Sequence, residues 1–271
     1  MVLLHLVDLD PALAALRPLG GFFALHTPLS GSVGGPVGGS VEPAGPLPTL
    51  AQAYARTPET SETPENPHGY GDPLTFRVRK VTLALRAPEG RIGASVAQQG
   101  LAARLWSVAL GCAVLYGSVP DLDPGLLRWD PDAAAPDDLW LTEVRARPGD
   151  AATVAATVLD GHLEPLAAAL RARHPVAPGL LRGNAGSALA GTARQLDQWA
   201  RAHGRPDVAV RARALTAELF THPLLADTGT LTGTAFRRRS CCLYYRVPGG
   251  GLCGDCCFTR PPRSSPRAPS G

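Results

Sequence analysis

The sequence lacks a long hydrophobic run and a strong excess of charge of either sign. Apolar stretches such as residues 108–116 fall well short of the ~20 residues that a membrane-spanning helix needs. The formal net charge is +3, which is too small to indicate a nucleic-acid partner. The first residues are apolar but carry no basic region and no Ala-x-Ala cleavage signal, so we expect a cytoplasmic protein without a membrane span.

Several cofactor-binding patterns are also missing. The acidic residues between positions 120 and 148 do not follow the EF-hand spacing for calcium, so we expect them to be solvated turn and cap residues. Gly249, Gly251 and Gly254 match the pattern G-x-G-x-x-G, but no βαβ unit surrounds them and we treat the match as chance. Because no phosphate-binding loop is found either, neither a bound dinucleotide nor an ATP site is expected. The acidic residues in question include Asp121, Asp123, Asp130, Asp132, Asp137 and Asp138.

The chain has 271 residues, of which 45% are hydrophobic, enough for one large domain or two small ones. Its apolar periodicity predicts an α+β protein that is predominantly helical, with a small β component. We divide it into four parts. These are an N-terminal helical segment with Gly/Pro-rich and Pro/Glu-rich loops (1–73), a mainly helical body (74–235), a cysteine motif (236–258) and a disordered tail (259–271).

Individual elements follow from the same patterns. We expect two packed helices over residues 91–116, with a joint near Trp106 and Ser107, and three helices over residues 151–226. Short strands and turns are predicted for 120–148, and 74–85 fits either a half-exposed strand or the start of a helix. The other expectations are a helix over 1–24, a mobile loop over 30–48 and a polar, Pro-rich linker over 57–73.

Cysteine usage is strongly uneven. Five of the six cysteines lie between positions 241 and 257, whereas Cys112 stands in an apolar run and is expected to fill the core. Without a secretory signal, such a cluster indicates metal binding before it indicates disulfides. The clustered residues are Cys241, Cys242, Cys253, Cys256 and Cys257.

Four thiolates without a nearby histidine suit an iron–sulfur cluster or structural zinc. Cys253 and Cys256 form a C-x-x-C turn that either metal accepts. The adjacent pair Cys241 and Cys242 needs a kinked backbone to converge, because neighbouring side chains of an extended chain point to opposite faces. This pair favours an iron–sulfur cluster, while structural zinc and redox-active thiols or disulfides stay open as alternatives. Cys257 leaves the fourth ligand ambiguous.

Residues 236–256, with the pattern Cys-Cys, ten residues, Cys, two residues, Cys, resemble the C-terminal signature of the FhuF-type ferric siderophore reductases. Residues 100–107 and 183–189 are also similar to that family. Cys257 departs from the family pattern, which usually has another residue there, and the insert at 30–48 is a second departure.

The resemblance implies a cytoplasmic protein with a helical siderophore-binding body and a [2Fe–2S] cluster. Its implied ligands are Cys241, Cys242, Cys253 and Cys256. The implied activity is reduction of Fe(III) in imported siderophores, especially hydroxamates, with release of Fe(II). An external electron donor, a ferredoxin or a flavin reductase, would refill the cluster. Alternative functions are a structural zinc-binding interaction protein and a protein related to siderophore biosynthesis.

Residues outside the cysteine motif carry weaker hypotheses. We expect Arg237, Arg238, Arg239 and Arg246 to steer an acidic donor or an anionic complex toward the cluster, or to be a solvated basic turn. Asn184 is expected to cap a helix and Trp106 to lie in the core. We expect His162 and His174 to be packed or exposed histidines rather than iron ligands; these two are not assigned to the site.

Overall fold

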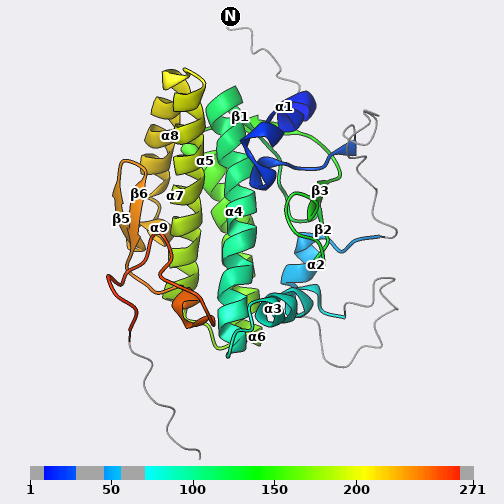
Figure 1. The fold of residues 1–271 in the computed structure, drawn as a ribbon. Coiled ribbons are helices and arrows are strands. Elements are labelled where there is room, and N and C mark those ends of the chain that lie inside the picture. Colours follow the sequence, from blue (N-terminus) through cyan, green and yellow to red (C-terminus); the bar gives the residue numbers. More distant parts are fainter. Residues whose placement is uncertain (1–8, 29–45, 56–70, 263–271) are drawn as a thin grey trace, which may run out of the picture.

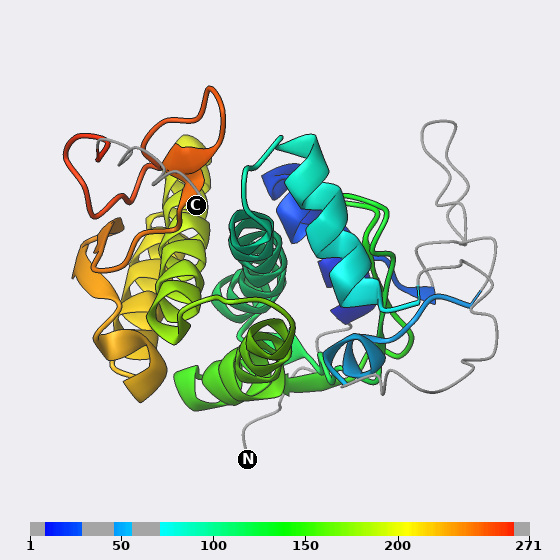
Figure 2. The same cartoon turned by 90° about the horizontal axis from the view of Figure 1, so that it is seen from below.

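The computed structural model describes residues 9–28, 46–55 and 71–262 of the chain. Two long helices, α4 (Gly90–Tyr116) and α7 (Pro178–Ala202), lie side by side in the middle of the molecule (Figures 1 and 2). Their buried contact includes a hydrogen bond between the Oγ of Ser107 and the Oγ1 of Thr192, 3.2 Å apart. These two helices form the support on which the rest of the chain is arranged.

The prediction of two helices over 91–116 is wrong, because α4 runs through Trp106 and Ser107 without a break. No proline interrupts this span, and both residues at the expected joint are buried against neighbouring elements. The helix ends where Gly117 adopts a left-handed conformation, with φ of 70°. The expected core positions of Trp106 and Cys112 are confirmed, since both side chains are fully buried.

Shorter helices surround this pair. Residues 74–84 belong to a helix rather than a strand, and Asp72 caps its first turn by accepting a hydrogen bond from the backbone N–H of Thr75 at 2.9 Å. The predicted helices over 151–226 are present, and a π-helical segment precedes Pro165, which lies in the first turn of α6. The surrounding helices are α3 (Pro73–Ala84), α5 (Ala151–Ala155), η4 (Ala156–Leu163), α6 (Glu164–Arg173), α8 (Pro206–Leu219) and α9 (Pro223–Ala226).

The N-terminal part is less regular than predicted. Within its described residues, the expected helix over 1–24 is reduced to α1 (Leu9–Ala15) and two short 3-10 turns, η1 (Arg17–Leu19) and η2 (Gly21–Phe23). Pro18 and Gly20, whose φ is 126°, explain why the α-helix does not continue. Helix α2 (Leu50–Tyr54) follows.

Several expectations fall largely outside the described residues. The predicted loop over 30–48 and the predicted linker over 57–73 overlap the undescribed positions 29–45 and 56–70, and most of the predicted tail lies beyond position 262. The division of the chain into four parts stays a prediction.

Within the described part of the chain, the β component consists of three antiparallel strand pairs, which confirms a predominantly helical α+β fold. Two of them lie in the region 118–148, as predicted. The third is a hairpin next to the cysteines that the sequence patterns did not reveal. The pairs are β1 (Ser118–Pro120) with β4 (Ala146–Pro148), β2 (Leu127–Trp129) with β3 (Leu139–Leu141), and β5 (Gly229–Thr232) with β6 (Ala235–Arg238).

One predicted turn acid has a different role. Asp138 is buried and forms an ion pair with buried Arg104, whose Nε lies 2.8 Å from its Oδ1. Arg104 also donates hydrogen bonds to the backbone carbonyls of Gly21, Phe22 and Pro136. The expectation of a solvated carboxylate is therefore wrong at Asp138, which neutralises the α4 residue Arg104 that holds the N-terminal segment.

Across residues 9–28, 46–55 and 71–262, none of the helices combines the length and the apolar character that a membrane crossing requires.

Candidate metal centre

The cysteine segment, residues 241–257, follows strand β6 and lies along the outer side of α7 (Figures 1 and 2). Its backbone is irregular except for one 3-10 turn, η5 (Tyr244–Arg246). The preceding β5–β6 hairpin packs closely on the same helix. The predicted boundary between helical body and cysteine motif falls inside this hairpin.

Glycines on α7 make this close approach possible. A Cβ atom at Gly186 would lie 2.6 Å from the Oγ1 of Thr228 and 3.2 Å from the ring of Phe236. That ring also packs on Phe220, with 5.1 Å between the ring centroids. The hairpin therefore needs a residue without a side chain at position 186.

The backbone bends directly after the adjacent cysteines. Leu243 has a φ of 68°, a left-handed conformation that bends the chain directly after Cys242. In this bend the backbone N–H of Leu243 donates a hydrogen bond to the Sγ of Cys241 at 3.2 Å. The bend thus brings a backbone amide to the sulfur of the first predicted ligand.

The C-x-x-C turn is also present. The backbone N–H of Cys256 donates to the carbonyl of Cys253 at 3.1 Å, and the turn closes without a positive φ at Gly254. The Sγ of Cys256 accepts a hydrogen bond from the backbone N–H of Phe258 at 3.4 Å. Amide-to-sulfur hydrogen bonds of this kind tune the reduction potential of iron–sulfur clusters.

The two cysteine pairs meet through Cys242 and Cys253, whose Sγ atoms are 3.5 Å apart. Sharing one proton between these sulfurs lowers the pKa of Cys242 to about 6, and the charge of Arg238 adds to this effect. The same contact raises the pKa of Cys253, while burial raises that of Cys241 to about 11. The pair therefore gives up its first proton readily, as a metal-binding thiol must.

Polar side chains from α4 and α7 hold the segment in place. The carboxylate of Asp255, between the last two predicted ligands, is buried and accepts hydrogen bonds from Ser187 at 2.6 Å and from Arg194 at 3.0 Å. On the other side, the hydroxyl of Ser95 donates to the carbonyl of Cys242 at 2.8 Å. Sequence reasoning did not identify these anchoring residues, because their role depends on tertiary contacts.

Asn184 belongs to the same network. Its Nδ2 donates to the carbonyl and to the hydroxyl of Ser95, at 2.9 and 3.1 Å. The expectation that it caps a helix is wrong, because α7 begins at Pro178 and Asn184 lies inside the helix, fully buried. It connects α7 to α4 directly behind Cys242.

The basic residues separate into two groups. Arg238 is 2% exposed, so the expectation of a surface position is wrong for this residue. Arg237, Arg239 and Arg246 are exposed, as a steering role requires. Arg239 forms an ion pair with exposed Asp227 at 2.9 Å, and Arg246 with Glu89 at 2.7 Å.

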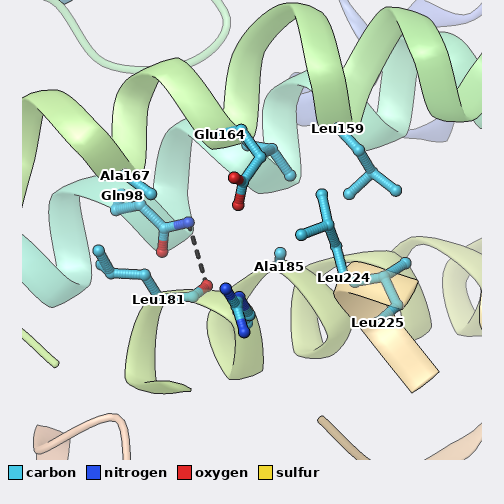
Figure 3. Close-up of a pocket in the computed structure, with 10 residues that line it drawn as sticks. Gln98, Leu159, Glu164, Ala167, Leu181, Ala185, Leu224 and Leu225 are labelled. Carbon is cyan, nitrogen blue, oxygen red and sulfur yellow. Dashed lines mark hydrogen bonds between the residues drawn. The ribbon is translucent and has the colours of Figure 1, made fainter. Parts of the chain in front are cut away.

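A small cavity lies between α4, α6, α7 and α9. It has a volume of about 10 Å³, room for about one water molecule, and is bordered mainly by aliphatic side chains. In Figure 3 the carboxylate of Glu164 points into the space between Gln98 and Leu224. Sites that enclose a drug-sized ligand typically have ~300–1,000 Å³, so this cavity does not enclose a siderophore.

The histidines are placed as expected. His162 is fully buried, with its Nδ1 3.0 Å from the hydroxyl of Tyr54 and its Nε2 bonded to the carbonyl of Leu122. Desolvation lowers its pKa to about 4. His174 is half-buried, and burial lowers its pKa as well.

The donor set fits a thiolate-bound cofactor. All the cysteines of the segment are free, and all except buried Cys242 are half-buried. In the described ranges, no three Cys, His, Asp or Glu side chains are grouped so as to hold a single metal ion. The observed contact instead joins one cysteine from each pair.

Residues 238–258 match the family model described as the FhuF 2Fe-2S C-terminal domain. This match confirms the resemblance over the cysteine segment, and the cofactor of a domain of this kind is a [2Fe–2S] cluster. A search of the curated proteins found no match.

Proposed function

We propose that this protein is a ferric siderophore reductase whose [2Fe–2S] cluster is held by Cys241, Cys242, Cys253 and Cys256. The match of residues 238–258 to a FhuF-type 2Fe-2S domain carries this proposal. The contact between Cys242 and Cys253 supports the ligand set, because it brings together one member of each cysteine pair.

The chemistry of the substrate supports one-electron transfer. Hydroxamate oxygens are hard donors that hold Fe(III) far more tightly than Fe(II), so a single electron is enough to weaken the complex. When bound, the cluster supplies that electron. No hydride-carrying cofactor is needed in the same chain.

The chain's own residues keep the thiols near the surface. Ser95 and Asp255 fix the backbone on both sides of the segment, while the half-buried sulfurs remain open to an approaching complex. Since the cavity between α4, α6, α7 and α9 is small, we place the ferric siderophore on the outer face of the cysteine segment. The helical body then serves as the rigid support of this face.

The activity is tested by trapping the product. Protein purified without oxygen is supplied with dithionite and a ferric hydroxamate, and Fe(II) is followed with a ferrous chelator. We expect release at a rate proportional to the cluster content, and background release from Cys242→Ser. Equal release from both proteins would contradict the proposal. A colourless protein that contains zinc instead of iron and sulfide would favour the structural zinc alternative.

The electron donor is proposed to be an acidic protein, a ferredoxin or a flavin reductase, in the cytoplasm. Exposed Arg237, Arg239 and Arg246 surround the cysteine segment and attract such a partner over a distance of ~10 Å at moderate salt. Charge reversal by Arg237→Glu should slow cluster reduction by an acidic ferredoxin at low salt, with a smaller effect at high salt. An unchanged rate in stopped-flow measurements would exclude steering.

A further inference from the structure

Arg238 is buried, whereas its neighbours Arg237 and Arg239 are exposed. Side chains of β6 alternate between solvent and the interior, so Arg237 points outward and Arg238 points toward α7. Its side chain is 2% exposed. A guanidinium is too basic to lose its proton, so Arg238 remains a cation in this buried position.

The protein provides this cation with backbone acceptors. Its Nε donates to the carbonyl of Ser240 at 3.0 Å and its Nη2 to the carbonyl of Leu180 at 3.2 Å. Its Nη1 is buried and has no hydrogen-bond partner among the described residues.

No carboxylate of the described chain forms an ion pair with Arg238. Its backbone N–H donates to the carbonyl of Asp255, but the carboxylate of Asp255 is engaged by Ser187 and Arg194. A buried charge is costly unless an opposite charge compensates it. The position therefore requires an anion that does not come from an acidic side chain.

The surrounding structure is shaped to accommodate this side chain. A Cβ atom at Gly183 of α7 would lie 3.0 Å from the Nη2 of Arg238 and 2.1 Å from the Oγ of Ser240. Hydrogen bonds place Arg238 beside both cysteine pairs: its Nε donates to the carbonyl of Ser240, which directly precedes Cys241, and its backbone N–H donates to the carbonyl of Asp255, which directly precedes Cys256.

We propose that Arg238 is the buried counter-ion of the cluster and raises its reduction potential. The inference rests on the ligand set of the proposed function. A four-thiolate cluster is an anion, and the electron it takes from a donor adds one negative charge. A fixed cation stabilises the reduced form more than the oxidised form, and burial strengthens this effect because little water or salt screens it.

The test is the midpoint potential of the full-length, cluster-loaded protein, followed by optical and paramagnetic redox titration. Arg238→Met removes the charge and retains an apolar stem, whereas Arg238→Lys retains the charge. Arg237→Met is the matched control, because it removes a charge from the next residue of the same strand. Each protein is measured at about 50 mM and about 500 mM salt, where exposed charges are screened to different extents.

We expect Arg238→Met to shift the potential downward by the same amount at both salt concentrations, and Arg238→Lys to shift it less. Arg237→Met should have a small effect that fades at high salt. Equal shifts at the two positions, or no shift in Arg238→Met, would overturn the proposal.

If a variant does not assemble its cluster, its iron and sulfide content is compared with that of wild type instead of its potential. Loss of the cluster from Arg238→Met with retention in Arg238→Lys would support the need for a charge. Loss from both variants, with helical circular dichroism unchanged, would assign Arg238 a structural role and overturn the proposal. The midpoint potential is measured without siderophore, so it can be obtained even if the protein does not reduce ferric siderophores. If wild-type protein contains no cluster, the proposed function itself is contradicted.

Discussion

Cys257 provides a fifth thiol beside the predicted ligand Cys256. Its own pKa is raised by burial and by the charge of Cys256. Its carbonyl accepts a hydrogen bond from Arg237 at 3.3 Å. Of the two neighbouring thiols, Cys256 belongs to the C-x-x-C turn, in which its backbone N–H donates to the carbonyl of Cys253 at 3.1 Å. This turn favours Cys256 as the ligand.

The first prediction concerns this choice. Cys257→Ser should retain the cluster with wild-type visible absorbance and iron content, whereas Cys256→Ser should lose most of both, because an alcohol replaces a thiolate ligand. Iron and sulfide analysis after anaerobic purification measures the difference. The reverse pattern would assign the fourth ligand to Cys257.

A second prediction concerns His162, which lies far from solvent. Its pKa of about 4 in the folded state is below the value of about 6.5 in an unfolded chain, so protons bind preferentially to the unfolded state between these values. Stability from this residue is complete above pH 6.5 and is lost as the pH falls toward 4. Between pH 7 and pH 5 wild type should lose about 2 kcal/mol more unfolding free energy than His162→Asn.

Urea unfolding of both proteins at the two pH values provides the measurement. Taking the difference between wild type and variant removes the contribution of other titrating groups, such as His26. Parallel losses in the two proteins would contradict the assignment of a neutral, buried imidazole.

The role of a single residue could be predicted where its spacing in the sequence is enough to indicate that role. The cysteine pattern identified the metal centre, and the apolar run around Cys112 placed that residue in the core. A run of three arginines, in contrast, does not reveal which member is buried. The alternation of strand β6 decides that Arg238 points inward, and the strand itself was not evident from its sequence.

At the level of elements, helices were predicted better than strands. The apolar periodicity of 151–226 is long enough to identify its helices, whereas the strands here have three or four residues each. The joint expected within α4 was wrong because local composition does not show that Trp106 is enclosed by other elements. Ser95, Asn184 and Asp255 support the site through contacts between elements, which no local pattern encodes.

The third prediction tests how the hairpin docks on α7. Gly186→Ala should destabilise the protein by about 1–3 kcal/mol, because its Cβ would press on Thr228 and the Phe236 ring. Gly191, on the same helix, has no atom within 4 Å of an added Cβ, so Gly191→Ala should be neutral or stabilising by up to about 1 kcal/mol.

Both variants gain the same helix propensity, so the difference between their unfolding free energies measures the effect of the contact with the hairpin. Denaturant unfolding gives the free energies, and the iron content shows whether the cysteine segment is disturbed as well. Equal stabilities would mean that the hairpin does not need the close approach at position 186.

For the molecule as a whole, the pair of Arg104 and Asp138 joins segments distant in sequence. Asp138→Ala leaves a buried guanidinium without its counter-ion and should cost about 3–5 kcal/mol of unfolding free energy. The control is Asp132→Ala, which removes an exposed partner of Lys80 and should cost less than about 1 kcal/mol. If thermal or urea unfolding shows similar losses of stability in Asp138→Ala and Asp132→Ala, the structural role of the Arg104–Asp138 ion pair is contradicted.

The arrangement of the whole molecule is consistent with the proposed reduction at the surface of the cysteine segment. Helices α4 and α7 support a short cysteine segment near the surface (Figures 1 and 2), and the arginines next to it are exposed Arg237, Arg239 and Arg246 and buried Arg238. This arrangement suits electron transfer to a bulky complex that never enters the protein interior.

The most direct test is a single-turnover experiment. Protein with a reduced cluster is mixed anaerobically with a ferric hydroxamate in the absence of any further reductant. The account predicts that the cluster spectrum returns to the oxidised form while one Fe(II) appears for each cluster. A reduced spectrum that persists with every ferric siderophore tried would contradict it.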